Sequence, residues 1–213
     1  MNQAQLDFEN LLFSRYPELL PLREALHTAL DGLRAAYDSG GKVLVCGNGG
    51  SAADSEHIVG ELMKGFLRRR PLTEEQRAAL IAAGGSENMA DSLQQGLPAI
   101  SLVSQSGVIS AFANDVDPDM IFAQQTFAYG NSGDVLIALS TSGNSANVVN
   151  AVIAGKAKGM FCIGITGEKE SRLSALCSVC FRTPTCETYQ VQEYTLPLYH
   201  TLCAMTEFAY FDR

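Results

Sequence analysis

The chain has 213 residues, of which 46% are hydrophobic and 18% charged, so it can bury a full apolar core and is not intrinsically disordered. The net charge of −8, with only 15 lysines and arginines, argues against binding to nucleic acid or to an anionic membrane. No apolar run is as long as a transmembrane helix, and the first residues lack the pattern of a signal peptide. We therefore expect a cytoplasmic protein with a single domain over residues 1–213.

Helical periodicity dominates the start of the chain. Residues 3–37 carry apolar side chains at helical spacing, interrupted near Pro17 and Pro21. From residue 42 onward, short apolar runs alternate with helical segments, which is typical of parallel strands covered on both faces. We predict strands at 42–47, 98–103, 134–140, 160–166 and 179–184. We predict helices at about 51–66, 119–129, 145–158 and 187–211. The fold class is an open, doubly wound α/β sheet with N-terminal helices and a helical insertion.

Residues 67–97 form the insertion, a long connection that breaks the alternation of strands and helices. Within it, Thr73 is a suitable N-cap for a helix that ends at Gly84-Gly85. We expect the insertion to border the active site, because it follows directly on the helix at 51–66. The alternative is a solvated surface helix.

The six cysteines fit a reducing compartment, and four of them lie in apolar runs, where cysteine packs as a small hydrophobic residue. The spacing of three of them indicates part of a zinc site, but no fourth ligand lies near them in the sequence. We predict reduced packing thiols, with a zinc site as the alternative. The three are Cys177, Cys180 and Cys186.

Two loops at strand ends are unusually rich in glycine and hydroxyl groups. Gly47–Asp54 follows the first predicted strand, and Ser140–Ser145 follows the third; each precedes a helix. Glycines allow close backbone approach, and free N–H groups at a helix start favour an anion. Ligands of open α/β sheets bind beyond the carboxyl ends of the strands, so two such loops predict a phosphate pocket; ordinary capped turns are the alternative. Neither loop has a dinucleotide or P-loop fingerprint, which favours a small phosphorylated ligand.

Four further side chains are candidates for chemistry. His57 and Glu61 lie at positions i and i+4 of a predicted helix and therefore share one face. They could form an ion pair, two arms of a metal site, or a base beside its partner. Gln192 and His200 lie about 12 Å apart along an ideal last helix. Either Pro197 bends this helix and brings them together, or the site draws on more than one subunit.

Taken together, these motifs resemble the SIS (sugar isomerase) domain of the phosphoheptose isomerase group over about residues 40–210. They occur in the order Gly47–Asp54, His57 with Glu61, Ser140–Ser145, and Gln192 with His200. The resemblance implies a five-stranded parallel sheet flanked by helices. It also implies a homotetramer with active sites at subunit interfaces, and one zinc ion per subunit, as several members bind zinc.

The resemblance further implies roles for individual residues. The substrate would contact Asn48, Gly49, Gly50, Ser51, Asp115, Ser140, Thr141, Ser142, Ser145 and Gln192. The zinc ligands would be His57, Glu61, Gln192 and His200. Glu61 and His200 would also be the catalytic acid–base pair. Glu61 cannot serve as ligand and base at once, so the ion would leave, shift or inhibit.

The sequence also departs from the family pattern. Gly65 stands where the family has a basic residue, Gln190 replaces an arginine, and Thr195 replaces a histidine. We expect the nearby run Arg68–Arg70 to supply the missing positive charge at the active site.

The implied activity is aldose–ketose isomerisation of a sugar phosphate, most simply sedoheptulose 7-phosphate to D-glycero-D-manno-heptose 7-phosphate. A base would remove the α-proton and an acid would protonate the enediolate oxygen, roles that suit a carboxylate and an imidazole. Two alternatives remain at this stage. One is a non-catalytic SIS module that binds a sugar phosphate or regulates a protein partner. The other is a hexulose or amino-sugar isomerase on the same scaffold.

Overall fold

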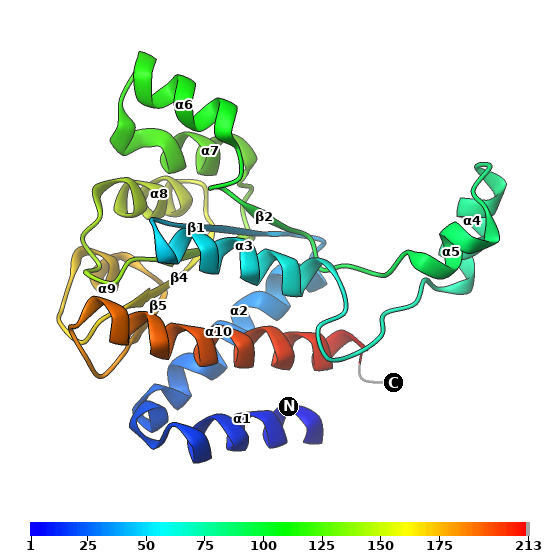
Figure 1. Ribbon diagram of the computed structural model, residues 1–213, viewed down its shortest axis with the longest axis horizontal. Helices are drawn as coiled ribbons and strands as arrows, with labels where there is room; N and C mark the ends of the chain where they lie inside the picture. The colour runs from blue at the N-terminus through cyan, green and yellow to red at the C-terminus, as the bar shows by residue number, and fades with distance from the viewer. Residues whose placement is uncertain (212–213) are drawn as a thin grey trace.

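A five-stranded parallel sheet forms the centre of the computed structural model, which describes residues 1–211 (Figure 1). The strand order is β2-β1-β3-β4-β5. All five predicted strands are confirmed, as β1 Val43–Gly47, β2 Ala99–Ser101, β3 Val135–Leu139, β4 Phe161–Thr166 and β5 Val179–Arg182. In this order the chain reverses its direction of winding at β1 and β3, the place where open sheets bind ligands.

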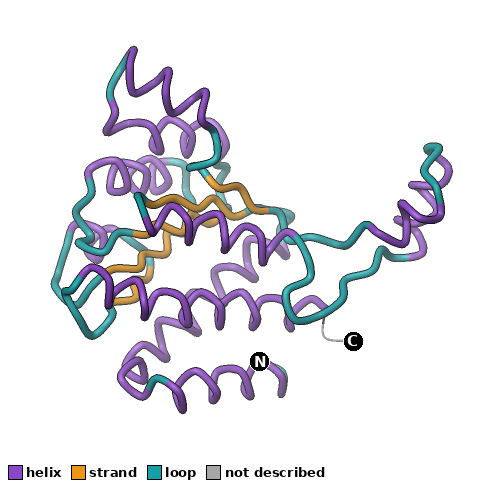
Figure 2. Tube along the Cα trace, in the orientation of Figure 1, coloured by secondary structure: helices purple, strands orange, loops and turns teal. Residues whose placement is uncertain are grey.

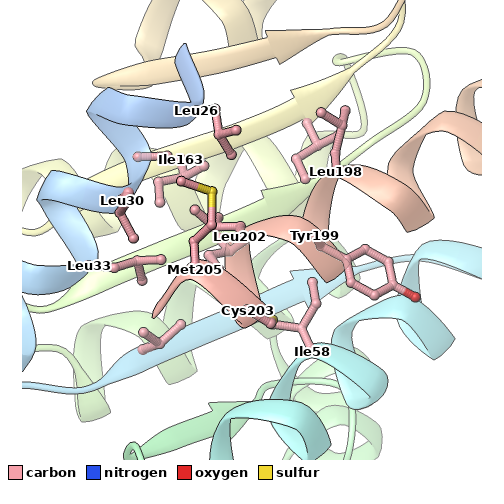
Figure 3. Close-up of a cluster of buried hydrophobic side chains, with 14 of the residues drawn as sticks. Leu26, Leu30, Leu33, Ile58, Ile163, Leu198, Tyr199, Leu202, Cys203 and Met205 are labelled. Atoms are coloured by element: carbon pink, nitrogen blue, oxygen red, sulfur yellow. The ribbon is translucent and has the colours of Figure 1, made fainter. Parts of the chain in front are cut away.

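The two faces of the sheet are covered by different helices. Val43 and Val45 point into one apolar cluster, whereas Leu44 and Cys46 point into another, as strand alternation requires. The first cluster includes side chains from α2 (Arg23–Asp38), α3 (Gly50–Met63) and α10 (Thr188–Phe211), and Figure 3 shows part of it. The second includes side chains from α7 (Ile121–Tyr129), α8 (Ala146–Ala157) and α9 (Arg172–Leu176). The four helices predicted between and after the strands are confirmed as α3, α7, α8 and α10.

The N-terminal helices lie against the last helix. The predicted break near the two prolines is confirmed: α1 (Gln3–Arg15) ends before the 3-10 helix η1 (Pro17–Leu22), and α2 follows. The Gln5 amide donates a hydrogen bond of 2.8 Å to the carbonyl of Met205 on α10. Glu9 is buried on α1 and accepts from Arg23 at 2.8 Å and contacts His27 at 3.0 Å.

The insertion projects from the body as an arm (Figure 2). It carries α4 (Glu74–Ala82) and α5 (Glu87–Ser92). Thr73 caps α4 through a capping box, and the chain turns after α4 at Gly84, whose φ is +96°, so both predicted signals are confirmed. The two helices of the insertion, α4 and α5, extend away from the sheet in this chain, whereas its first residues reach the end of α3, where Arg70 donates to the carbonyl of Glu61 at 3.0 Å. That the insertion borders the active site stays a prediction.

Two more helical segments lie between β2 and α7, namely α6 (Ser106–Asp115) and the 3-10 helix η2 (Pro118–Met120). No residue of α6 is buried, although the helix carries Val108, Ile109 and Phe112. None of the described helices has both the length and the apolar character needed to cross a membrane.

Candidate active site

A polar cavity of about 290 Å³ lies at the carboxyl ends of β1 and β3. The loops that follow these two strands both contribute to it, so the structure brings together the two motifs that the sequence separates by some 90 residues. Its lining comprises Asn48, Gly49, Gly50, Ser51, Leu139, Ser140, Thr141, Ser145, Thr188 and Gln192. The cavity therefore occupies the topological switch point of the sheet.

Three helices begin at this cavity. Gly50 and Ser51 open α3, Ser145 is the N-cap of α8, and Thr188 is the first residue of α10. Gly49, with φ of +57°, makes the turn into α3. No N-cap side chain caps α3 or α8. The N–H groups of Ser51 and Ala52 donate to the carbonyls of Asn48 and Gly49, both at 3.0 Å, and that of Val148 donates to Asn147 Oδ1 at 2.9 Å, so a ligand would meet the remaining N–H groups of these first turns. The lining contains no lysine or arginine, and the helix starts supply the positive potential that would attract an anion.

Hydroxyl and amide groups complete the cavity. Ser140 and Ser145 lie with their Oγ atoms 3.0 Å apart. The Gln192 amide lies directly against Gly50: a Cβ atom at Gly50 would stand 2.3 Å from Gln192 Nε2. Gly50 is thus required for Gln192 to reach the cavity.

Two of the predicted substrate-binding residues lie outside this cavity. The Ser142 hydroxyl accepts a hydrogen bond from the backbone N–H of Asn144 at 3.2 Å, and Ser142 lines a neighbouring hollow with Glu168 and Lys169. Asp115 is exposed at the end of α6, where it accepts from the side chain of Asn114 at 2.8 Å. The single chain leaves Asp115 outside the cavity lining, whereas Ser142 borders the cavity through Thr141, which lines both hollows.

A second cluster lies further along α3 and α10, which run side by side in the same direction (Figure 1). His57 Nε2 is 3.0 Å from Glu61 Oε1 and 3.5 Å from His200 Nε2. His57 is seven residues beyond Gly50 on α3, and His200 is eight beyond Gln192 on α10. At 1.5 Å per residue, the cluster lies about 10 to 12 Å from the cavity. Gln192 and His200 therefore stay apart within this chain, because α10 runs on as one helix past Pro197.

The charges around the cluster differ from the sequence-based expectation. Lys64 Nζ lies 3.0 Å from Glu61 Oε2, so this lysine provides the nearby positive charge. Arg70 was expected at the active site, and this is wrong: its side chain is fully buried and pairs with Glu207, Nε to Oε1 2.8 Å. Burial and the neighbouring His57 lower the pKa of His200, while Glu61 raises it. His200 is therefore held towards its neutral form.

Two further residues next to the cluster, Asp54 and Tyr199, were not predicted from the sequence. The Tyr199 hydroxyl lies 3.2 Å from Asp54 Oδ1 and 2.9 Å from His57 Nδ1. Asp54 precedes His57 by one helical turn, which could have placed it on the same face of α3. The position of Tyr199 depends on how α10 packs on α3, and no local signal in the sequence contains that information.

The donor types in this cluster suit zinc. Two ligands of a tetrahedral zinc ion lie about 3.3 Å apart, and the distances from His57 to Glu61 and to His200 are close to this value. However, Gln192 lies at the cavity instead, and the described residues hold no ready-formed group of three His, Cys, Asp or Glu ligands. The cysteines form no such group among the described residues either, and all six are free thiols. Within a single chain, the arrangement is therefore chemically suitable for zinc but incomplete.

Comparison with known proteins gives a consistent result. The profile of the SIS domain family matches residues 19–89 and 78–167. The phosphoheptose isomerase of Rhodospirillum rubrum is 37% identical over 183 residues, covering 86% of this chain and 85% of the relative. That of Aneurinibacillus thermoaerophilus is 35% identical, covering 91% of this chain and 84% of the relative.

Solved structures agree with the sequence matches. The phosphoheptose isomerase of Neisseria gonorrhoeae superposes with a TM-score of 0.70 at 29% identity, covering 95% of this chain and 93% of the other. The phosphoheptose isomerase of Francisella tularensis superposes with a TM-score of 0.72 at 26% identity, covering 97% and 99%.

Proposed function

We propose a function from one premise: the chain belongs to the SIS domain family and, within it, to the phosphoheptose isomerase group. The proposed function is the interconversion of sedoheptulose 7-phosphate and D-glycero-D-manno-heptose 7-phosphate. The observation that carries it is the pairing of an anion-binding cavity, at three helix starts, with a His–Glu–His cluster about 10 Å along the same two helices.

The phosphate would bind in the cavity. Ser51, Ser140, Thr141 and Ser145 offer hydroxyl groups, and the first turns of α3 and α8 offer backbone N–H groups. Ser142 and Asp115 were also predicted to bind substrate, and within this chain they would need a loop movement or a neighbouring subunit to do so. Anchoring the phosphate would hold the carbon chain in one orientation and lower the entropic cost of reaction.

The length of a heptose phosphate suits the distance between cavity and cluster. Seven bonds separate the phosphorus atom from C2 of a heptulose 7-phosphate, which at about 1.2 Å per bond in an extended chain is about 8 Å. The side chains of Glu61 and His200 span the remaining distance to the reacting carbons. A triose phosphate, four bonds shorter, would leave its carbonyl far from both groups.

Glu61 and His200 would then share the proton transfers. In the proposed reaction the Glu61 carboxylate removes the proton from the carbon next to the carbonyl. His200, held towards its neutral form, donates its ring N–H to the developing enediolate oxygen. Glu61 then returns its proton to the neighbouring carbon while His200 takes back a proton from the hydroxyl on the carbon that was first deprotonated, which completes the isomerisation with no net gain or loss of atoms. Lys64 Nζ, 3.0 Å from Glu61 Oε2, places a positive charge beside this carboxylate.

The proposal also includes the binding of a zinc ion. His57, Glu61 and His200 would hold it, with Gln192 as the fourth predicted ligand after a rearrangement. A bound zinc ion would polarise the sugar carbonyl. Glu61 cannot remove a proton while it binds the metal, so the proton transfers above are assigned to the residues alone.

The proposal also includes a homotetramer with active sites at subunit interfaces. An apolar groove of about 180 Å³ lies beside His200 and is lined in part by Leu11, Phe66 and Leu196, two of which are more than one-third exposed. Such a groove at a reacting residue supports coverage by a second subunit. Light scattering that gives only the 22.8 kDa monomer at micromolar concentration would contradict this part. We also assign the protein to the cytoplasm, on the ground that all six cysteines are free.

Incubation with sedoheptulose 7-phosphate, followed by NMR of the sugar carbons, tests the function. We expect conversion to the aldose phosphate, and loss of turnover in Glu61→Gln and His200→Gln with retention of phosphate binding. Fructose 6-phosphate serves as the comparison for a shorter chain. Tight binding of the heptulose phosphate without any conversion would instead support a non-catalytic SIS module.

A further inference from the structure

Two asparagine side chains join the loops that form the polar cavity. Asn48 Nδ2 donates to Asn147 Oδ1 at 2.8 Å, and Asn147 Nδ2 donates to Asn48 Oδ1 at 3.0 Å. Asn48 lies in the loop after β1 and lines the cavity, whereas Asn147 is the second residue of α8 and is not among the lining residues. The pair therefore connects the segments that follow two neighbouring strands, across 99 positions of the chain.

A third hydrogen bond fixes the direction of both amide groups. The backbone N–H of Val148 donates to Asn147 Oδ1 at 2.9 Å. An amide oxygen can only accept and an amide NH2 group can only donate, so the oxygen of Asn147 must lie on the Val148 side. The NH2 group of Asn147 must then face the oxygen of Asn48. If Asn48 turned by half a revolution, two NH2 groups and two oxygens would meet, so the first turn of α8 sets the orientation of Asn48.

This arrangement leaves one donor of Asn48 unused. Its amide has two N–H groups, and the ring formed with Asn147 uses the one on the side of its own oxygen. Within residues 1–211 the second N–H has no acceptor. The cavity has no lysine or arginine in its lining, so an anion there must be held by neutral donors. A donor that is already held in place costs less to order when the ligand arrives.

We infer that Asn147 is a positioning residue, which holds the Asn48 amide so that its unused N–H is presented to the phosphate of the substrate. The inference rests on the proposed function, in which the cavity binds that phosphate. Without Asn147, the Asn48 amide could turn either way, and its oxygen would repel an anion whenever it faced one. Asn147 thus acts through Asn48 and does not itself contact the ligand.

A double-mutant cycle tests this dependence. Calorimetric titration with sedoheptulose 7-phosphate would compare Asn48→Ala, Asn147→Ala and the double variant. We expect Kd to rise about 10- to 100-fold in Asn48→Ala, which loses a hydrogen bond to a charged oxygen. In Asn147→Ala we expect a rise of about 3- to 10-fold, the range of one neutral hydrogen bond. In the Asn48→Ala background, Asn147→Ala should have no further effect, because its target is gone.

The cycle separates positioning from a general effect on α8. Asn147→Ala also leaves the Val148 N–H without its acceptor, which can loosen the start of the helix. If that were the whole effect, Kd would rise by the same factor in both backgrounds, and this would overturn the inference. An unchanged Kd in Asn147→Ala would overturn it as well. Asn150→Ala is the matched control on the same helix, because Asn150 Nδ2 donates to the Asp119 carbonyl at 3.0 Å and not to a cavity residue; Kd should stay at the parental value.

Kinetics supply a second readout. We expect Asn147→Ala to raise KM for the heptulose phosphate by about 3- to 10-fold with little change in kcat, because the phosphate is held equally in the ground state and the transition state. The two hypotheses fail separately. The expected pattern of Kd values without turnover would retain the positioning role and reject the proposed reaction. Turnover with the same factor in both backgrounds would reject only the positioning role, and a parent protein that binds no sugar phosphate would reject both.

Discussion

Arg70 and Glu207 form a salt bridge with both side chains completely buried, Nε to Oε1 2.8 Å. Glu207 also accepts from the backbone N–H groups of Phe66 and Leu67, and Arg70 donates to the carbonyls of Glu61 and Leu62. The pair therefore ties the end of α3, where Glu61 lies, to the last helix.

Removing one partner of this pair should be costly. Arg70→Ala would leave the Glu207 charge buried and unpaired, and we expect the free energy of unfolding to fall by about 3 to 5 kcal/mol. Urea denaturation followed by circular dichroism measures this. Arg77→Ala is the control, because Arg77 pairs with two exposed carboxylates on the arm and should change stability little. Similar losses in both variants would show that burial does not govern the effect.

Hydroxyl groups that line the cavity should matter more than those beside it. Ser51→Ala removes one hydrogen bond to a charged phosphate oxygen, worth about 1.5 to 3 kcal/mol, so the Kd for a sugar phosphate should rise about 10- to 100-fold. Thr141→Ala should act in the same direction. Ser142→Ala should change Kd little, because its hydroxyl is bonded within its own loop. Calorimetric titration decides, and a large effect at Ser142 would move the phosphate towards the neighbouring hollow.

A methyl group at Gly50 should displace Gln192 without unfolding the chain. The new Cβ would stand 2.3 Å from Nε2, the far end of a flexible side chain, so the amide can swing away. We expect weaker sugar-phosphate binding in Gly50→Ala. Gly60→Ala is the matched control on the same helix, where a Cβ would meet nothing within 4 Å. It should stabilise the protein by up to about 1 kcal/mol and leave binding unchanged, as thermal unfolding and titration would show.

Zinc binding should depend on the two histidines of the cluster and not on His27. We expect up to one zinc per subunit, removable by a chelator without unfolding, and lost in His57→Ala and in His200→Ala. Binding should weaken as the pH falls through the histidine range, since only a neutral imidazole binds metal. His27→Ala is the control, because His27 pairs with Glu9 far from the cluster. Elemental analysis that finds parental zinc in both cluster variants would exclude this site.

One cysteine should react far faster than the others. Cys186 is exposed, whereas burial raises the pKa of Cys180 to about 12 and that of Cys162 to about 11. At pH 8 the thiolate fractions of these two would be about one in ten thousand and one in a thousand. Alkylation followed by peptide mass spectrometry should find early modification at Cys186 only, and modification at all six positions in denaturant.

The strands and the cavity could be predicted from the sequence because their signals are local. Val135–Leu139 is a continuous apolar run, and the loop after it holds four hydroxyl groups just before a helix. Parallel strands place such loops at one edge, so the meeting of Ser51 with Ser140 follows from topology alone. Thr73 and Gly84 marked the ends of α4 for the same local reason.

Features that depend on packing between distant segments could not be predicted. Arg70 lies in a run of three arginines that resembles a solvated patch, and its burial depends on Glu207, 137 residues later. The separation of Gln192 from His200 depends on α10 continuing past Pro197. The outward course of α4 and α5 follows from how the whole chain packs, and no local signal in residues 67–97 specifies it.

The contact between α1 and α10 has a consequence for synthesis on the ribosome. Gln5 is buried in the folded chain, where its amide donates to the carbonyl of Met205, 200 residues later. The sheet and its crossover helices can pair as they emerge, and α1 can meet α2 early through Glu9, but its packing on α10 must wait until the last helix has left the exit tunnel. Until then the ring of Phe8 lacks its partner Phe208, so the first helix to be made is among the last to complete its packing.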